Sequence, residues 1–226
     1  MAAKAPDAPE SPTSSFADQT TITIDWTAPY NGGSDITSYT VQWNLGGPGT
    51  DFYDLSTVSA STLTFTQSGL TTGEIYTFRV FATNYIDPSA PSGTLQVYAA
   101  TKPLQPSTPA EVSADQNQIT IRWTATAEST GTSTGFNGGS TITSYKIYVK
   151  HTGNFEEVHE TTTLSNLEYQ LTSSVTGHTL TGNSYAFKVS AVNVVGESDL
   201  SEEIVIIAAL VPQAATNLAK VSADVS

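Results

Sequence analysis

The fold is decided by residues 31–41, which read N-G-G-S-D-I-T-S-Y-T-V. The stretch returns in residues 137–147 as N-G-G-S-T-I-T-S-Y-K-I. In both copies a glycine turn leads into a run in which apolar and polar residues alternate, as they do in a strand with one buried face. A repeat at this spacing predicts two modules, because each copy has enough chain around it for one hydrophobic core.

A second alternating run precedes each glycine turn. Residues 21–26 read T-I-T-I-D-W, and residues 118–123 read Q-I-T-I-R-W. A period of two places the isoleucines and the tryptophan of each run on one face of a strand. The outward residues change between the copies while this apolar face does not, so we expect the apolar face to be buried.

A third motif follows in both copies. Residues 70–84 read L-T-T-G-E-I-Y-T-F-R-V-F-A-T-N, and residues 180–193 read L-T-G-N-S-Y-A-F-K-V-S-A-V-N. Tyr, Phe, Val, Ala and Asn recur at every second position, which predicts a turn and a long strand. Shorter strands are predicted in residues 52–55, 63–66, 95–99, 156–161, 168–172 and 204–208.

The three motifs together resemble the fibronectin type III family, and the resemblance covers nearly all of residues 6–211. It implies an all-β chain of two seven-stranded Greek-key β-sandwiches in tandem. It also implies that the corner tyrosine hydroxyls of Tyr76 and Tyr185 bond to nearby backbone, although the second corner is one residue shorter. The predicted structural core comprises Trp26, Tyr39, Leu70, Tyr76, Phe78, Trp123, Tyr145, Tyr185 and Phe187.

We divide the chain into four segments on this basis. Residues 1–15 are expected to be a tail or an upstream linker, residues 16–102 the first module, and residues 103–211 the second. The linker between the modules carries three prolines in residues 101–109, which restrict the backbone and should limit bending. Residues 212–226 are expected to begin a truncated third module, and hence to be part of a longer array.

The composition excludes several classes of function. The net charge is −13, and the 8 basic residues form no cluster. Nucleic acid and anionic membrane are therefore poor partners, because both are bound through clustered lysine and arginine. No apolar run is long enough to insert into a bilayer. The chain has no cysteine, which excludes disulfides and thiolate zinc sites but leaves its compartment open.

The residue types needed for catalysis are present without a catalytic arrangement. His151, His159 and His178 lie on separate turns or strands, and none flanks a serine in a nucleophile elbow. The two nearer histidines could approach Glu156 and Glu157 across a hairpin and hold a divalent ion. A glycine-containing turn would do little to fix such ligands, so we expect no enzyme, no metal and no cofactor.

Two loops are candidate interaction surfaces. Ile86, Asp87, Pro88 and Ser89 look like the acidic tripeptides that integrins recognise, and the alternative is a turn punctuated by proline. The loop over residues 124–136 is longer than its counterpart in the first copy. We hypothesise that it buttresses the junction between the modules, and the alternative is a mobile loop rich in Ser, Thr and Gly.

The sequence therefore predicts a non-enzymatic, monomeric segment of a multi-module array. Such a segment would act as a semi-rigid spacer and protein-binding scaffold in a large adhesion or cell-surface protein, with other proteins and neighbouring modules as partners. One alternative is an intracellular cytoskeletal or giant-protein array, which the lack of cysteine and of N-x-S/T sequons favours. Another is an accessory module of a carbohydrate-active enzyme.

Overall fold

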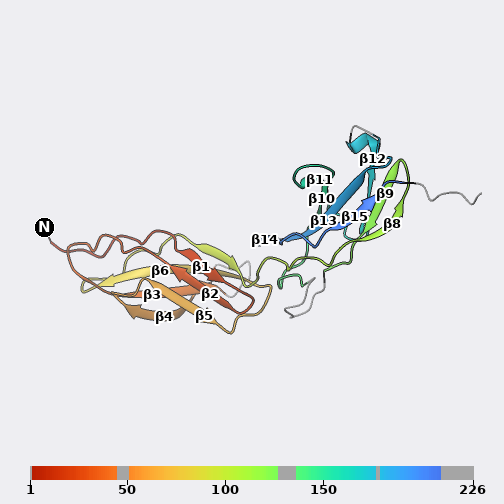
Figure 1. The fold of residues 1–226 in the computed structure, drawn as a ribbon. Coiled ribbons are helices and arrows are strands. Elements are labelled where there is room, and N and C mark those ends of the chain that lie inside the picture. The colour runs from red at the N-terminus through yellow and green to blue at the C-terminus, as the bar shows by residue number, and fades with distance from the viewer. Residues whose placement is uncertain (1, 45–50, 127–135, 177–178, 210–226) are drawn as a thin grey trace, which may run out of the picture.

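The chain folds into two β-sandwiches joined end to end (Figure 1). The computed structural model describes residues 2–44, 51–126, 136–176 and 179–209. Within these ranges the strands of each sandwich pair only with one another, and every pairing is antiparallel. The predicted all-β fold is confirmed. No helix in the described ranges is long and apolar enough to span a bilayer.

The first sandwich contains seven strands in two sheets. One sheet has the order β1-β2-β5 and the other β4-β3-β6-β7. The strands are β1 (Thr13–Ala17), β2 (Thr21–Asp25), β3 (Ile36–Asn44), β4 (Tyr53–Ser59), β5 (Thr64–Ser68), β6 (Ile75–Asn84) and β7 (Leu95–Tyr98).

The second sandwich repeats this order. One sheet runs β12-β9-β8, and the other runs β11-β10-β13-β14 with β15 also paired to β13. The elements are β8 (Ala110–Ala114), β9 (Gln118–Arg122), β10 (Ser144–Lys150), β11 (Glu156–Thr161), β12 (Glu168–Thr172), the short helix α1 (Ser173–Thr176), β13 (Ser184–Asn193), β14 (Gly196–Glu197) and β15 (Ile204–Ile207).

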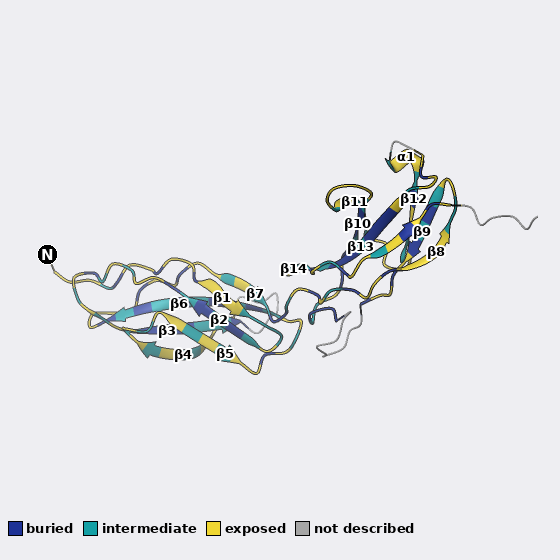
Figure 2. Ribbon diagram, viewed as in Figure 1, coloured by how far each residue is buried: buried dark blue, intermediate teal, exposed yellow. Residues whose placement is uncertain are grey.

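Each core lies between the two sheets of its sandwich, where the alternating residues of the long strands meet (Figure 2). In β6 every second residue is buried, as the period of two predicts. Trp26 packs edge-on against Tyr39 with ring centroids 5.6 Å apart, and Trp123 packs against Tyr145 at 5.8 Å. The structure also buries Leu70, Tyr76, Phe78, Tyr185 and Phe187.

The structure departs from the expected tail at residues 1–15. Strand β1 begins at Thr13 within that segment. Pro6, Pro9 and Pro12 are buried along the first sandwich, at the same spacing as the buried Pro103, Pro106 and Pro109 of the linker. A proline-rich stretch shows no period of two, and proline donates no ladder hydrogen bond, so the sequence pattern did not reveal a packed edge segment.

Each long strand, β6 and β13, is preceded by a corner with a tyrosine. The Thr71 amide donates a 2.9 Å hydrogen bond to the Tyr76 hydroxyl. In the second sandwich burial raises the pKa of Tyr185, and a hydrogen bond with the Asn183 side chain opposes that rise. Both tyrosines therefore have hydrogen-bond partners at the start of a long strand.

Replacing either core tryptophan should unfold its own sandwich at a lower temperature. We expect Trp26→Ala and Trp123→Ala each to lower the free energy of unfolding by about 3 to 5 kcal/mol, because each leaves a cavity between the sheets. Differential scanning calorimetry measures this loss. Tyr85→Ala is the control, since that side chain is 82% exposed. A loss for either tryptophan no larger than that of the control would contradict the prediction.

Candidate functional site: the joint between the sandwiches

The linker that leaves β7 is bound by the second sandwich. The Thr101 amide donates to the Gly138 carbonyl at 2.9 Å, and the Leu104 amide donates to the Phe136 carbonyl at 2.8 Å. These two bonds pair the linker with the chain around the Asn-Gly-Gly turn. The linker is therefore an extension of the second sandwich as well as the end of the first.

Asn193, the last residue of β13, binds the linker and the turn together. Its side-chain Nδ2 donates to the carbonyls of Thr101 at 2.7 Å and Asn137 at 2.9 Å. Its Oδ1 accepts the amides of Val195 at 2.8 Å and Gly196 at 3.1 Å. The side chain is buried, and these bonds use both of its amide protons and both lone pairs of its oxygen. One amide group thus holds three segments in place.

The linker passes so close to residue 138 that only glycine fits there. Its φ of 76° lies in the left-handed region that favours glycine. A Cβ at this position would clash with the Thr101 carbonyl oxygen. The Asn137 side chain closes the turn by accepting the Gly139 amide at 2.9 Å. The repeated Asn-Gly-Gly stretch is therefore part of the joint and not only the entrance to a strand.

The loops of the first sandwich meet the same turn from the other side. A Cβ added to Gly139 would clash with the Thr72 side chain and lie 3.2 Å from Gln19 Cγ. A Cβ added to Gly73 would lie 2.9 Å from the Gly139 carbonyl oxygen, so the two backbones also pass close together. The side-chain amide of Gln19 donates a hydrogen bond to the Thr101 hydroxyl at 3.2 Å. The Thr72 hydroxyl in turn donates to the Gln19 carbonyl at 3.0 Å. A groove of about 450 Å³ runs beside this contact, between β1, β7, the linker and Val195.

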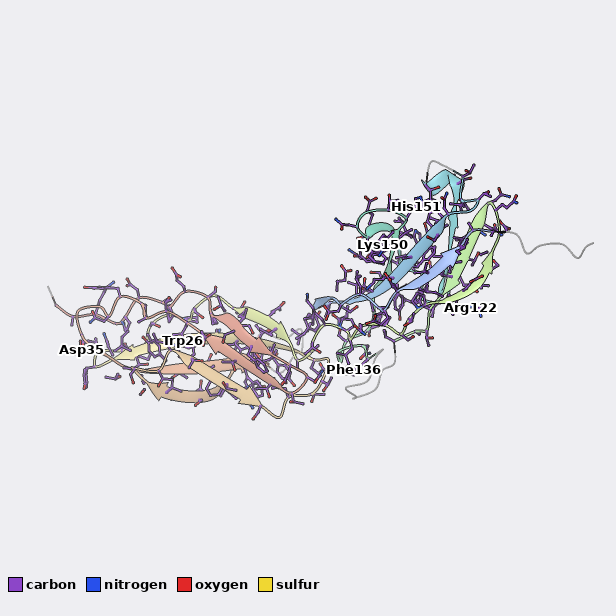
Figure 3. All side chains as sticks on the ribbon, in the orientation of Figure 1. Trp26, Asp35, Arg122, Phe136, Lys150 and His151 are labelled. Atoms are coloured by element: carbon purple, nitrogen blue, oxygen red, sulfur yellow. The ribbon has the colours of Figure 1, made fainter. Side chains whose placement is uncertain are left out.

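The two described residues that flank the long loop of the second sandwich, Thr126 and Phe136, are buried. Phe136 lies at the end of the second sandwich that faces the first (Figure 3), and it is 7% exposed. At the other end the Thr126 amide donates to the Tyr145 hydroxyl at 2.8 Å. Residues 127–135 lie outside the described part of the chain. The hypothesis that this loop buttresses the junction therefore falls on residues outside the described part of the chain and stays a prediction.

The candidate interaction loop of the first sandwich is only partly available. Ile86, Asp87 and Pro88 are exposed. Ser89 is buried, and its hydroxyl accepts the Ala82 amide at 3.0 Å. The sequence did not show that Ser89 differs from its three neighbours, because a serine in a turn can either be exposed to a partner or form a hydrogen bond within the turn. Three of the four residues can therefore contact a partner.

The two histidines that the structure describes stack on different tyrosines. His151 stacks on Tyr185 with ring centroids 4.9 Å apart, and His159 stacks on Tyr169 at 5.3 Å. His178 lies outside the described residues. Among the residues that the structure describes, no group of three His, Cys, Asp or Glu could hold a metal ion.

A polar cluster covers the outer face of the second sandwich. Glu197 accepts hydrogen bonds from Tyr148 at 2.6 Å and Ser190 at 2.7 Å, and Lys146 lies 3.4 Å away. Lys146 also donates to Glu157 at 3.1 Å. Burial alone would raise the pKa of Glu197, but the two hydrogen bonds and the Lys146 charge hold this pKa below its usual value of 4.5. Burial and the Glu197 carboxylate raise the pKa of Tyr148 to about 12.

The corresponding face of the first sandwich carries different chemistry. Arg79 donates to Gln42 at 2.8 Å, and Gln42 donates to Asp54 at 2.7 Å. The Arg79 guanidinium lies 4.0 Å from the centre of the Phe52 ring. The two sandwiches therefore repeat their cores and their joint residues but present different outer faces.

Substituting Gly138 should release the linker. We expect Gly138→Ala to remove the hydrogen-exchange protection of the Thr101 amide, because the added Cβ meets the Thr101 carbonyl. Gly182→Ala is the matched control, with a φ of 75° and nothing within 4 Å of its added Cβ. It should cost only the left-handed strain of about 1 to 2 kcal/mol. Equal losses of stability and a protected Thr101 amide in both variants would argue against this role.

The Glu197 cluster should make stability depend on pH. Because the folded-state pKa of Glu197 is lowered, its contribution to stability is present above about pH 4.5 and is lost as the pH falls through the lowered pKa. We expect Glu197→Gln to destabilise the protein at about pH 7 and to differ less from the parent at about pH 3. Urea unfolding at both pH values measures this, with Glu111→Gln as an exposed control. If the stability difference between Glu197→Gln and the parent does not become smaller at acid pH, the stabilising role of the ionised Glu197 is refuted.

Comparisons with known proteins agree with this architecture. Residues 7–95 match the model of the fibronectin type III domain. Mouse "Cell adhesion molecule-related/down-regulated by oncogenes" is 25% identical over 209 residues, which cover 88% of this chain and 16% of that protein. Human "Brother of CDO" is 35% identical over 94 residues, covering 41% of this chain and 8% of that protein.

A bacterial protein also aligns with both sandwiches. "Exoglucanase B" of Cellulomonas fimi is 30% identical over 210 residues, covering 88% of this chain and 17% of that protein. The chain thus spans less than a fifth of the length of each of these curated relatives. Residues 7–95 therefore belong to the fibronectin type III family, and residues 110–207 repeat the strand order of that module.

Proposed function

We propose that this chain is a non-enzymatic, semi-rigid spacer and protein-binding scaffold within a longer array of modules. The observation that carries the proposal is the joint, where the linker is bonded to both sandwiches. The Thr101 amide and carbonyl bond the second sandwich, while its hydroxyl accepts a bond from Gln19 of the first. Bending between the sandwiches would break the bond from Gln19 to Thr101, and detaching the linker would leave the Asn193 amide without a partner in a buried site.

The linker prolines support the same conclusion. Pro103, Pro106 and Pro109 are buried against the second sandwich, so the linker runs along its surface instead of crossing open solvent. Each proline fixes one backbone angle and reduces the freedom of the unbound linker. A short linker of this composition sets the spacing between modules, and the different outer faces of the two sandwiches offer separate surfaces for weak protein contacts.

The relatives favour an adhesion setting. The mouse and human relatives called "Cell adhesion molecule-related/down-regulated by oncogenes" both carry cell adhesion in their name. We infer an extracellular or cell-surface location, with other proteins and neighbouring modules as the partners and a monomeric state for this chain. An intracellular array would use the same joint, and the lack of cysteine is compatible with it.

A second candidate is an accessory segment of a carbohydrate-active enzyme. The observation that favours it is the alignment with Exoglucanase B, which runs through both sandwiches at 30% identity. Within such an enzyme the two sandwiches would still act as a spacer, with the same joint fixing their relative position. Cosedimentation with insoluble cellulose separates the two settings: retention of the chain on cellulose favours the second, and its absence leaves the adhesion setting preferred.

The spacer role is tested by small-angle X-ray scattering on two matched asparagine variants. Asn193→Ala removes the side chain that binds the linker at the joint, and Asn84→Ala removes the same bonds at the free end of the first sandwich. We expect each to lower the stability of its sandwich by about 1 to 3 kcal/mol. Only Asn193→Ala should broaden the distribution of overall dimensions, and calcium should leave the parent unchanged.

The matched pair keeps the test specific to the joint. Circular dichroism first establishes that both variants remain folded. A parent chain that already samples a broad range of dimensions would reject the semi-rigid spacer. An increase in the maximum dimension of the parent chain on adding calcium would instead point to an ion bound at the joint.

A further inference from the structure

A pocket of about 260 Å³ opens in the second sandwich beside α1, at the end remote from the first sandwich (Figure 2). Its floor is made by residues that belong to the core or pack against it, so it lies between the two sheets. These residues are Val149 of β10, Val158 of β11, Leu171 of β12 and Tyr185 of β13. A cavity of about 150 Å³ holds benzene, and pockets for drug-sized ligands begin at about 300 Å³. The pocket therefore has the size for one fused ring.

The first sandwich fills the corresponding space with its own tryptophan. The strand registers make Val149 the counterpart of Trp43, and they match the two tyrosines that begin the long strands. Trp43 stacks on Tyr76 with ring centroids 5.5 Å apart. Valine has no ring that could stack in this way on Tyr185. The pocket is therefore the space that an indole occupies in the first sandwich.

His151 lines the pocket of the second sandwich (Figure 3). Its ring stacks on Tyr185 with centroids 4.9 Å apart, and its Nδ1 lies 3.1 Å from the Ser184 carbonyl oxygen. These two contacts fix the imidazole against the tyrosine. Aromatic rings pack edge-to-face or offset against one another, so the two fixed rings form a wall for a further planar ring.

A longer loop before β13 builds the opposite wall. In the first sandwich Gly69 alone separates β5 from Leu70, whereas residues 173–179 separate β12 from Leu180 in the second. The longer loop forms α1, and Val175 and Thr176 of this helix line the pocket. Val175 is 49% exposed. A ligand that covered this side chain would gain the free energy of burying its apolar surface.

The rim of the pocket carries groups that form hydrogen bonds. Glu156 pairs directly with Val149 across β10 and β11, so the two side chains point to the same face. Glu156 is the only carboxylate among the described residues that line the pocket, and it can accept a bond from a ring N–H. Thr152 and Asn154 also line the pocket and can bond a peptide backbone. The rim therefore suits an indole that a peptide presents.

A sandwich attached to this end would leave the mouth of the pocket open. The first sandwich contacts the second through Gln19, Thr72 and Gly73. Tyr53 is the counterpart of Glu156, because it pairs with Trp43 as Glu156 pairs with Val149. Tyr53 is 57% exposed although the second sandwich follows. The opening of the pocket thus comes from Val149 and α1 and not from the end of the chain.

We propose that this pocket binds a tryptophan side chain of a partner protein, with the indole in the place of Trp43 and its N–H bonded to Glu156. The inference rests on the proposed scaffold function and deepens it by naming the chemistry of one partner. A second copy of this chain is not the occupant. Trp26 and Trp123 are buried, and Trp43 is stacked within its own sandwich.

Nuclear magnetic resonance on the full chain, with methyl-labelled valine, tests the binding. N-acetyl-tryptophanamide mimics a tryptophan within a peptide, and indole represents the free ring. We expect both to shift the methyl signals of Val149, Val158 and Val175, with a Kd of about 0.1 to 1 mM for so small a ligand. N-acetyl-phenylalaninamide has no ring N–H to bond a carboxylate, so it should bind about tenfold more weakly.

Two substitutions separate the ring space from the carboxylate. Val149→Trp gives the second sandwich the residue of the first, and it should abolish binding without lowering the melting temperature. Val205→Trp is the matched control, since Val205 is 58% exposed on β15 and does not line the pocket. Glu156→Val keeps the ring space, and it should remove the preference for the tryptophan amide over the phenylalanine amide.

Each outcome decides part of the proposal. If neither indole nor N-acetyl-tryptophanamide shifts the three valines, the pocket is not a binding site. Binding of indole without the amide overturns the assignment to a partner protein and indicates a free aromatic molecule. Binding that survives Val149→Trp in a folded variant overturns the location. If Val149→Trp does not fold, an unchanged preference in Glu156→Val overturns the assigned pose.

The test also distinguishes this inference from the spacer function. The pocket lies away from the joint, so Val149→Trp should leave the overall dimensions measured by X-ray scattering unchanged. Loss of binding with unchanged dimensions in the parent would overturn the inference alone. Broad dimensions in a parent that still binds N-acetyl-tryptophanamide would overturn the spacer alone.

Discussion

The structure depends on one buried amide at the end of the longest strand of each sandwich. Asn193 bonds the linker, the Asn-Gly-Gly turn and the loop after its own strand, and Asn84 does the same in the first sandwich. An unpaired amide in such a site would cost the desolvation of all its polar groups. Detaching the segment that enters each sandwich would therefore cause a large loss of folding free energy. This constraint turns a covalent linker into a defined joint.

Glycine makes that constraint possible. The linker carbonyl occupies the space that a side chain would fill at Gly138, so the turn and the linker can approach closely only if this residue has no Cβ. The next glycine, Gly139, lets the loops of the first sandwich approach the same turn. A stretch that starts a strand in each module is thus also the contact between modules. Spacing and folding are coupled because they use the same residues.

The strands and cores could be predicted because burial on one face of a strand imposes a period of two. The tryptophans, the long strands and the corner tyrosines all follow that pattern. The first strand of each sandwich could not be predicted in this way, because it follows a proline-rich segment and its own residues are mostly exposed, so it has no apolar face with a period of two. The role of Ser89 was also hidden, since its hydroxyl bonds a backbone amide that sequence alone does not place nearby. Neither feature carries a periodic signal.

The sequence by itself determined the fold of the two described sandwiches and the residues that fill each core, while the third module predicted from residues 212–226 lies outside the described residues. Those properties come from local alternation and from a repeat that can be compared with itself. Only the tertiary structure decided which residues form the joint. Gln19, Thr72 and Gly139 are far apart in the chain and have no pattern in common, and they meet because two folded sandwiches bring their loops to the same place. Contacts between loops of this kind depend on the position of whole modules, which no local spacing encodes.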